Sequence, residues 1–280
     1  MSELRTRLRN GFASLPRKQQ DVARLLADDD TFVSFASIST VAARAGVDKA
    51  TVVRTCQRLG FAGWTELQAA LRRSVAARPT LAERVARLSG DEADVVAGVA
   101  GQTIGNLEQT FEDLDRDAFD ELVSRLAGAQ LAVVAGGGAS EAAALYLTSS
   151  LQVIGHRAQL VTGAIDGAPV LAGLGPEDLV LAISAWRYLK STLELLAWAR
   201  DHGIPTGCIT DSAVAPGALE ADVTLVASTR SAGPRISLTA TVGLIEALIA
   251  AVALADHERS VAASERVDEL YRRRVVTGES

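Results

Sequence analysis

Short apolar runs that alternate with helical stretches limit most strongly how residues 131–255 can fold. The first run, LAVVAGGGAS, passes directly into a helical pattern, EAAALYLTSSLQVIG. Further apolar runs lie at residues 158–161, 179–183, 206–210 and 223–227, with helical segments near 189–202 and 238–255. Strands that alternate with helices pair in parallel, because a parallel pair needs a crossover connection, and continuous apolar runs indicate burial on both faces. The pattern predicts a doubly wound α/β sandwich around a parallel sheet.

Three loops of this sheet form the candidate ligand pocket. Open α/β sheets bind ligands beyond the carboxyl ends of their strands, where the strand order reverses. These ends fall at residues 136–140, at 184–188 and after Thr210. Three consecutive glycines let the first loop approach a ligand closely, and the helix that follows offers free N–H groups to an anion. The same glycines also suit a tight turn that binds nothing.

The second loop, SAWRYLKST, carries hydroxyl groups and one guanidinium at the start of another helix. Arg187 can grip a phosphate or a carboxylate through two parallel hydrogen bonds. The alternative interpretation is that Trp186 and Tyr188 serve packing while Arg187 forms a salt bridge. The residues of these two loops that we predict to bind an effector are Gly136, Gly137, Gly138, Ser140, Ser184, Arg187, Tyr188, Ser191 and Thr192.

Residues 37–64 predict two short helices joined by a tight turn. Apolar or small residues recur there at helical spacing, and Gly46 interrupts them where the helices would meet. Ser37 or Ser39 is placed to cap the first helix, and Asp48 is placed to cap the second. This is the arrangement of a helix-turn-helix, although a helical hairpin of this kind is also common in protein cores.

The second of these helices has a basic outer face that suits a DNA major groove. Val52 and Leu59 mark its buried side, so the polar residues between them are expected on the outside. Short polar groups near the start of such a helix reach base edges, and arginines along its flank reach phosphates. The predicted DNA-contacting residues are Ser39, Thr40, Lys49, Ala50, Thr51, Arg54, Gln57 and Arg58.

The charge distribution favours DNA binding over a merely solvated basic face. Residues 1–78 contain 13 Lys and Arg against 7 Asp and Glu, a net charge of +6, whereas the whole chain carries −6. An acidic protein with one basic end is expected to bind a polyanion at that end. We therefore expect double-stranded DNA as the partner of the N-terminal region.

The remaining patterns divide the chain into two domains. Helices are expected near residues 4–8, 16–28, 65–75 and 81–88, and one or two more across 95–127 with Asp115 as a cap. The three acids at 28–30 predict a solvated loop, and Trp64 is expected to fill the core in preference to stacking on a base. Pro79 and Gly90 mark a change of composition. The expected organisation is a helix-turn-helix domain at 1–77, a linker at 78–96 and an α/β domain at 97–280.

Composition argues against several classes of function. Cys56 and Cys208 fall in different expected domains without metal-ligand spacing, which argues against a disulfide framework or a zinc site. No N-terminal apolar segment predicts a signal peptide, and polar residues interrupt the apolar run at 238–255, so no membrane span is expected. We therefore expect a cytoplasmic protein without a metal or another cofactor.

Two parts of the chain resemble the RpiR family of bacterial transcriptional regulators. LPRKQQDVARLLADD and SISTVAARAGVDKATVVRTCQRLGFAGWTELQAALRR resemble the helix-turn-helix domain of that family. LAVVAGGGAS, EDLVLAIS, GIPTGCITDS and ALEADVTLVAS resemble a sugar-isomerase (SIS) domain. The resemblance implies a DNA-reading head joined to a domain that senses a phosphorylated sugar or a related metabolite. It also adds Ser237, or alternatively Thr239, to the effector-binding residues, because the family usually has a serine there, before its last long helix.

The chain departs from the family pattern at three places. Asp48 stands where a serine cap is usual, which keeps the capping chemistry, and Thr55 stands where a large apolar residue is usual. Thr55 is expected to loosen the local packing unless Cys56 rotates into its place. Phosphosugar-binding SIS domains typically carry a loop of SxSGxT type, whereas residues 184–188 read SAWRY. Either Arg187 replaces the missing hydroxyl groups electrostatically, or the ligand is not a simple phosphosugar.

The expected function is that of a DNA-binding transcriptional regulator whose SIS domain senses a small anionic metabolite, with a phosphosugar as the first expectation. SIS domains pair, so a homodimer or a higher homo-oligomer on a palindromic operator is expected. Two alternatives stay open: a phosphosugar isomerase, and an architectural SIS dimer without an effector. Isomerisation needs a proton shuttle, usually Glu or His, and His156, His202 and His257 all fall outside the predicted pocket loops.

Overall fold

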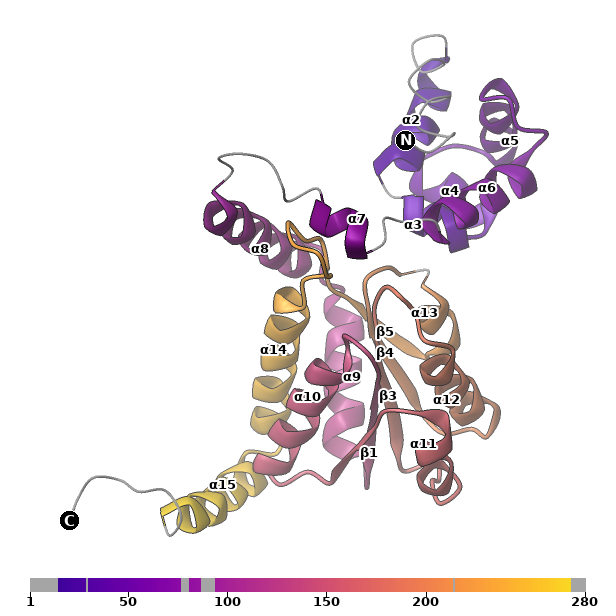
Figure 1. The fold of residues 1–280 in the computed structure, drawn as a ribbon. Coiled ribbons are helices and arrows are strands. Elements are labelled where there is room, and N and C mark those ends of the chain that lie inside the picture. The colour runs from indigo at the N-terminus through magenta and orange to yellow at the C-terminus, as the bar shows by residue number, and fades with distance from the viewer. Residues whose placement is uncertain (1–14, 29, 77–80, 87–93, 214, 273–280) are drawn as a thin grey trace. The chain divides into compact units, whose positions relative to one another are not determined.

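The computed structural model describes residues 15–28, 30–76, 81–86, 94–213 and 215–272 (Figure 1). The chain separates into two compact units, residues 1–87 and 88–280, which are described one at a time. In its described part the first unit is all helical, and the second is an α/β unit built on one parallel sheet.

Six helices make up the described part of the first unit. They are α2 (Arg17–Asp28), α3 (Asp30–Phe35), α4 (Ile38–Arg44), α5 (Lys49–Arg58), α6 (Trp64–Ala76) and α7 (Leu81–Ala86). All but α3 lie where the sequence predicts helices, whereas the helix expected near residues 4–8 lies outside the described residues. Val22, Val41, Val52 and Leu67 are fully buried, so α2, α4, α5 and α6 share an apolar core. Trp64 is half-buried where α6 begins.

Helix α3 begins at Asp30, the last of the three acids at which the sequence predicts a loop, and the sequence analysis does not predict this helix. Its Phe32 and Val33 are buried. From α6, Gln68 Nε2 donates to the carbonyl oxygen of Val33 at 3.2 Å, and Arg72 Nε donates to that of Ser34 at 2.7 Å. A helix of six residues has little stability of its own. Packing against α6 therefore stabilises it, and no local pattern reveals that packing.

Five parallel strands form the sheet of the second unit, in the order β2-β1-β3-β4-β5. The strands are β1 (Ala132–Gly136), β2 (Ala158–Val161), β3 (Leu179–Ser184), β4 (Thr206–Thr210) and β5 (Val223–Val226). Val134 of β1 is in register with Leu160 of β2 and with Leu181 of β3. The predicted strands and the predicted parallel sheet are confirmed.

Helices cover both faces of the sheet (Figure 1). One face carries α9 (Arg116–Gly128), α10 (Glu141–Val153) and α14 (Thr239–Ala255), and α8 (Val95–Glu112) packs on α14. The other face carries α11 (Ala164–Leu171), α12 (Lys190–Asp201) and α13 (Pro216–Glu220), and α15 (His257–Arg272) follows α14. Val134 and Leu181 enter the first core, whereas Val133 and Val180 enter the second. This two-sided burial explains why the strands are continuous apolar runs in the sequence.

The sequence does not predict the short helices α11 and α13, which have eight and five residues. Gly167 and Pro169 interrupt the apolar stripe that would identify α11. A Cβ at position 167 would lie 2.6 Å from Val161 Cγ1, so this helix lies tightly against β2. Close packing against β2 therefore stabilises α11, and its sequence lacks the periodic pattern of apolar residues that would predict a helix.

No single helix within the described ranges is long and apolar enough to cross a lipid bilayer. Helices α14 and α15 meet a test of length and composition only as a pair, with a bend of 109° between them. Among the residues that the structure describes, no group of three or more His, Cys, Asp and Glu side chains could hold a metal ion.

Candidate functional site

Helices α4 and α5 each begin with a capping contact that the sequence predicts. Ser37 Oγ accepts a hydrogen bond from the Thr40 N–H at 3.1 Å, and Asp48 Oδ1 accepts one from the Thr51 N–H at 2.6 Å. The hydrogen bond from Thr51 is the main cause that lowers the pKa of Asp48. Gly46 has a φ of +64°, a conformation that glycine adopts without strain. The geometry of the helix-turn-helix is therefore fixed at the start of both helices.

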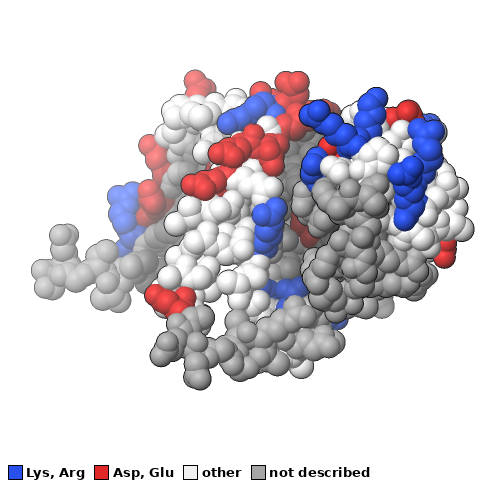
Figure 2. Space-filling view, turned by 90° about the horizontal axis from the view of Figure 1, so that it is seen from above, with Lys and Arg blue, Asp and Glu red and all other residues white. Residues whose placement is uncertain are grey.

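The outer face of α5 is basic. Exposed residues are Ser39 and Thr40 on α4 and Lys49, Ala50, Arg54, Gln57 and Arg58 on α5. Arg54 Nη2 donates to Thr51 Oγ1 at 3.0 Å and lies 3.8 Å from Asp48 Oδ1, so its guanidinium is held near the start of the helix. Figure 2 shows Lys and Arg side chains gathered on the visible face of the helical unit. The basic surface predicted for this helix is thus present.

Thr51 does not lie on that surface, contrary to the prediction. Its side chain is buried, with an exposed fraction of 4%. The buried residues of α5 are Thr51, Val52, Thr55 and Cys56. They form a wide sector because α5 packs against α2, α4 and α6 together, whereas a single stripe would suffice for one neighbour. Thr51 is placed to orient Arg54 through its hydroxyl, and it is not placed to reach base edges.

Thr55 and Cys56 lie side by side in the same core. Both are buried, and Thr55 Oγ1 donates to the carbonyl oxygen of Thr51 at 2.8 Å. This bond offsets the cost of burying the Thr55 hydroxyl group, and the neighbouring Cys56 is buried in the same core, as the second of the two expectations for this position has it. Burial raises the pKa of the Cys56 thiol to about 12, which keeps it protonated at neutral pH.

In the second unit, the strand order reverses between β1 and β3, where the sequence places the pocket. The chain passes from β1 to β2 on one side and from β3 to β4 on the other, so the loops after β1 and β3 start together and diverge. The Ala185 N–H donates to Ser140 Oγ at 3.5 Å across these loops. A Cβ on Gly137 would lie 2.7 Å from Leu189 Cδ1. The structure thus brings the two predicted loops into contact.

Two serine hydroxyl groups are buried where these loops meet. Ser140 and Ser184 are each 4% exposed. Ser184 Oγ has no hydrogen-bond partner among the described residues, although the Ser184 carbonyl oxygen accepts from Thr210 Oγ1 at 2.6 Å. Ser140 precedes α10, and its hydroxyl does not cap that helix. Because an unpaired buried hydroxyl costs about 1–3 kcal/mol, a polar ligand atom next to Ser184 would be stabilised.

Asp211, directly after β4, organises the loop after β3. Its Oδ1 accepts from the Tyr188 hydroxyl at 2.8 Å, and its Oδ2 accepts from the Trp186 N–H at 3.2 Å. The rings of Trp186 and Tyr188 meet edge to face, with centroids 5.9 Å apart. Arg187 between them is exposed, and the salt bridge of the alternative interpretation is not found among the described residues. The sequence predicts a loop after Thr210 but does not single out Asp211. The feature that could have identified it is an acidic residue directly after a buried strand.

The glycine loop after β1 is shaped by packing. A Cβ at Gly136 would lie 2.7 Å from Ala144 Cβ, and Gly138 has a φ of +60°. Both positions therefore need glycine for the turn itself, as the second interpretation of this loop predicts. The features of the loop that remain available to an anion are its N–H groups and Ser140.

The last three predicted effector residues occupy different environments. Thr192 is buried, and its Oγ1 lies 3.9 Å from the position of a Cβ on Gly137, so it lies beneath the glycine loop. Ser191 is half-buried near the start of α12. The Ser237 N–H donates to the carbonyl oxygen of Thr229 at 3.2 Å. The described hydrogen bonds of Ser237 stay within its own segment before α14 and do not reach the loops after β1 and β3.

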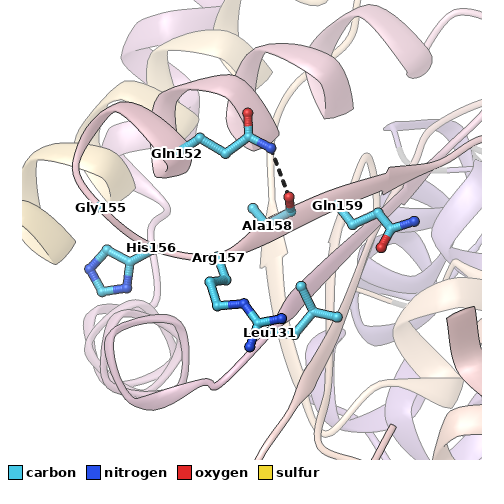
Figure 3. Close-up of a pocket in the computed structure, with 7 residues that line it drawn as sticks. All are labelled: Leu131, Gln152, Gly155, His156, Arg157, Ala158 and Gln159. Carbon is cyan, nitrogen blue, oxygen red and sulfur yellow. Dashed lines mark hydrogen bonds between the residues drawn. The ribbon is translucent and has the colours of Figure 1, made fainter. Parts of the chain in front are cut away.

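An open hollow lies at the opposite end of the strands, where β1 and β2 begin (Figure 3). Its lining residues are Leu131, Gln152, Gly155, His156, Arg157, Ala158 and Gln159. They precede or begin β1 and β2, and Gln152 Nε2 donates to the Ala158 carbonyl oxygen at 2.8 Å. Because parallel α/β sheets bind ligands at the carboxyl ends of their strands, the loops after β1 and β3 stay the candidate ligand site in preference to this hollow.

His156 lies in the turn between α10 and β2 and contacts α15. It is buried, and its Nδ1 lies 3.4 Å from Arg259 Nη1. Burial lowers the pKa of His156 and the positive charge of Arg259 lowers it further, while the carboxylate of Asp256 acts in the opposite direction. The folded chain therefore binds a proton at His156 more weakly than the unfolded chain does.

We expect acid to destabilise the α/β unit through His156. Below a pH of about 6.5 the unfolded chain binds this proton and the folded chain resists it. As the pH is lowered from about 6.5, the free energy of unfolding should decrease by at most about 1.4 kcal/mol per pH unit. The decrease should stop once the pH is below the lowered pKa of His156 in the folded state. Urea unfolding at two pH values should show a smaller fall for His156→Gln than for the wild type. The exposed His202→Gln is the control, and equal falls for His156→Gln and the wild type would contradict the prediction.

Both units match models of known protein families. The model of a helix-turn-helix domain of the rpiR family matches residues 2–78, and the model of the SIS domain matches residues 125–251. An HTH-type transcriptional regulator of Haemophilus influenzae is 25% identical over 249 residues, which are 85% of this chain and 86% of that protein.

Solved structures agree with these matches. The sugar isomerase domain of an RpiR transcription factor from Sphaerobacter thermophilus is 35% identical, with a TM-score of 0.61, over 63% of this chain and 99% of that chain. The NanR protein of Vibrio vulnificus, solved in complex with ManNAc-6P, is 22% identical, with a TM-score of 0.64, over 98% of this chain and 100% of that chain. At this identity, the likeness to NanR is a likeness of fold.

Proposed function

This chain belongs to the RpiR family of helix-turn-helix transcriptional regulators, and on that premise we propose that its SIS domain senses a phosphorylated sugar and so changes the affinity of the helix-turn-helix for DNA. The observation that carries this proposal is the buried Ser184 hydroxyl, which has no partner among the described residues at the point where the strand order reverses. A hydroxyl kept unpaired at the usual ligand position of this fold indicates a polar ligand.

The exposed face of α5 supports DNA as the partner of the first unit. Arg54 and Arg58 lie on the flank of the helix for phosphates, and Lys49 and Gln57 share the exposed surface with them. Ser39 and Thr40 on α4 add hydroxyl groups. The DNA sequence is then recognised by residues of α5, while the arginines supply affinity that depends on salt.

The loops after β1 and β3 offer the groups that a phosphate needs. Ser140 and Ser184 supply hydroxyl groups, the start of α10 supplies N–H groups, and the exposed Arg187 supplies a guanidinium that can bind two phosphate oxygens at once. Asp211 fixes the loop that carries Arg187. That NanR of Vibrio vulnificus was solved with ManNAc-6P makes this compound the first candidate effector to test.

A homodimer would allow effector binding to change the affinity for DNA. Two copies related by a two-fold axis present two recognition helices to two half-sites, so the operator is a palindrome. An effector changes DNA affinity only if it binds the two states of the pair with different affinities. We therefore place the homodimer, and with it the palindromic operator, within this proposal.

The test is a DNA titration of the full chain with labelled fragments from the region upstream of its own gene. It is run at two salt concentrations, with ManNAc-6P, with a panel of other phosphosugars and with the same sugars lacking phosphate. We expect one specific fragment and one phosphosugar that changes the dissociation constant by about fivefold or more. Two results would overturn the proposal: absence of specific DNA binding under all conditions, or equal responses to a sugar with and without its phosphate.

A further inference from the structure

We propose that Asn106 of α8 transmits the state of the ligand pocket to the helix that precedes the sheet, and so toward the DNA-binding unit. Helix α8 is the first described element of the second unit, so the chain leads from it back to the helix-turn-helix. The inference rests on the proposed function, because it concerns how a ligand at Ser184 acts on DNA binding.

Asn106 joins α8 to the segment between β5 and α14, which lies beside α8 in Figure 1. The residue is completely buried, and its Nδ2 donates to the carbonyl oxygen of Arg230 at 2.7 Å. Its Oδ1 accepts from Ser228 Oγ at 3.0 Å and from Gln102 Nε2 at 3.1 Å. One amide side chain thus both donates and accepts across two elements that lie more than 120 residues apart in sequence.

A second contact reinforces the same junction. The Ser228 N–H donates to Thr110 Oγ1 at 2.9 Å, and this hydroxyl donates to the carbonyl oxygen of Asn106 at 2.7 Å. Thr110 is also buried. Because Asn106 Oδ1 and Thr110 Oγ1 both accept from Ser228, displacement of Ser228 would remove these bonds from two buried side chains unless α8 moved with it.

Hydrogen bonds continue from this junction to the pocket. The residue before Ser228, Ala227, donates its N–H to the carbonyl oxygen of Thr210 at 2.8 Å. Thr210 Oγ1 in turn donates to the carbonyl oxygen of Ser184 at 2.6 Å. The residue after Thr210, Asp211, holds the loop that carries Arg187. Ser184, Thr210, Ala227 with Ser228, and Asn106 therefore form one continuous connection from the pocket to α8.

Chemistry and placement single out Asn106 within this connection. A carboxamide both donates and accepts, so it can hold the Arg230 carbonyl and the Ser228 hydroxyl at once, which neither an aliphatic residue nor a carboxylate can do. An apolar residue would suffice for packing at a buried helix position. A continuous set of contacts is by itself no proof of energetic coupling, so the test measures the coupling directly.

The first experiment needs no ligand and is a double-mutant cycle on the full chain. Thr210→Val removes the hydroxyl that reaches Ser184, and Asn106→Ala removes two of the three hydrogen bonds that join α8 to the neighbouring segment, leaving the one from Ser228 N–H to Thr110. The readout is the hydrogen-exchange rate of the α8 amides around residues 102–112. We expect Thr210→Val to speed this exchange by about twofold to thirtyfold, and we expect this effect to be clearly smaller in the Asn106→Ala background, where only the Ser228–Thr110 bond still joins the two elements.

Two further variants serve as controls for the double-mutant cycle. Gln102→Ala removes a bond within α8 that does not reach the neighbouring segment, so the effect of Thr210→Val should persist in it. Ser228→Ala replaces Asn106→Ala if the latter does not fold, because it removes one bond and leaves the buried amide in place. An unchanged effect of Thr210→Val in Asn106→Ala or Ser228→Ala overturns the inference, as does the absence of any effect on α8.

The second experiment uses ManNAc-6P as the probe. We expect Asn106→Ala to bind the probe and DNA as the wild type does, but to lose a change of about fivefold or more in DNA affinity on addition of the probe. A full response in Asn106→Ala overturns the inference. If the wild type does not bind the probe or any other phosphosugar, the proposed ligand class fails, and the ligand-free cycle still decides the role of Asn106.

Discussion

Operator DNA is expected to bind the variant Arg54→Ala/Arg58→Ala about thirtyfold more weakly, or worse, than the wild type. Each lost arginine contact to a phosphate or base is worth about 1–3 kcal/mol. The slope of log affinity against log salt concentration should also become shallower by about 1.8, because two phosphate contacts of about 0.9 each are removed. Both side chains are exposed, so the melting temperature should not change much. Fluorescence anisotropy at several salt concentrations measures the affinity and the slope together.

Two further variants make this result specific. Arg54→Lys/Arg58→Lys keeps both charges but loses the planar guanidinium, so it should keep the salt slope and lose affinity only where an arginine reads a base. Arg116→Ala removes an exposed arginine from the other unit and should leave binding unchanged. Wild-type affinity and slope in Arg54→Ala/Arg58→Ala would show that α5 does not face DNA.

Effector binding should be lost in Ser184→Ala and Arg187→Ala while DNA binding in the absence of effector is preserved. Loss of a hydrogen bond to a charged ligand is worth about 1.5–3 kcal/mol, so each variant should bind the phosphosugar about tenfold to a hundredfold more weakly. Ser184→Ala should not lower the stability of the ligand-free protein, because its buried hydroxyl has no partner among the described residues. Calorimetric titration and thermal unfolding together separate the two effects.

Lys190→Ala is the matched control for the loss of positive charge near the pocket. Its side chain, at the start of α12 and three residues from Arg187, is 90% exposed, and its Nζ lies 3.0 Å from Glu194 Oε1. Unchanged effector affinity in Lys190→Ala alongside a large loss in Arg187→Ala supports a specific contact. Effector binding that survives both Ser184→Ala and Arg187→Ala places the ligand elsewhere.

The parts of the fold that could be predicted from the sequence are those in which burial leaves a periodic or continuous signal. The runs LAVVAG and LVLAIS predict strands because both of their faces are buried by helices, and the sheet order follows the expected parallel topology. Ser37 and Asp48 predict helix starts because capping is a local contact between residues three apart.

The parts that could not be predicted depend on contacts between distant segments. Helix α3 exists because Gln68 and Arg72, more than 30 residues later, bind its carbonyl groups. Thr51 is buried because three helices surround α5, which a projection of one helix cannot show. Asp211 reaches the aromatic loop 23–25 residues earlier, so its role emerges only when β3 and β4 are side by side.

The cap of α5 has a consequence for how such a regulator would search a genome. Asp48 is exposed and its pKa is lowered, so a negative charge stands at the start of the helix that we propose to enter the major groove. That charge repels the phosphates of any DNA sequence, whereas base contacts are made at the operator alone. Asp48 therefore lowers the affinity for random and operator DNA by a similar factor, and only the operator regains affinity through its base contacts. The protein should spend less time on the millions of competing sites than one with a neutral serine cap, and should reach its operator with fewer long pauses.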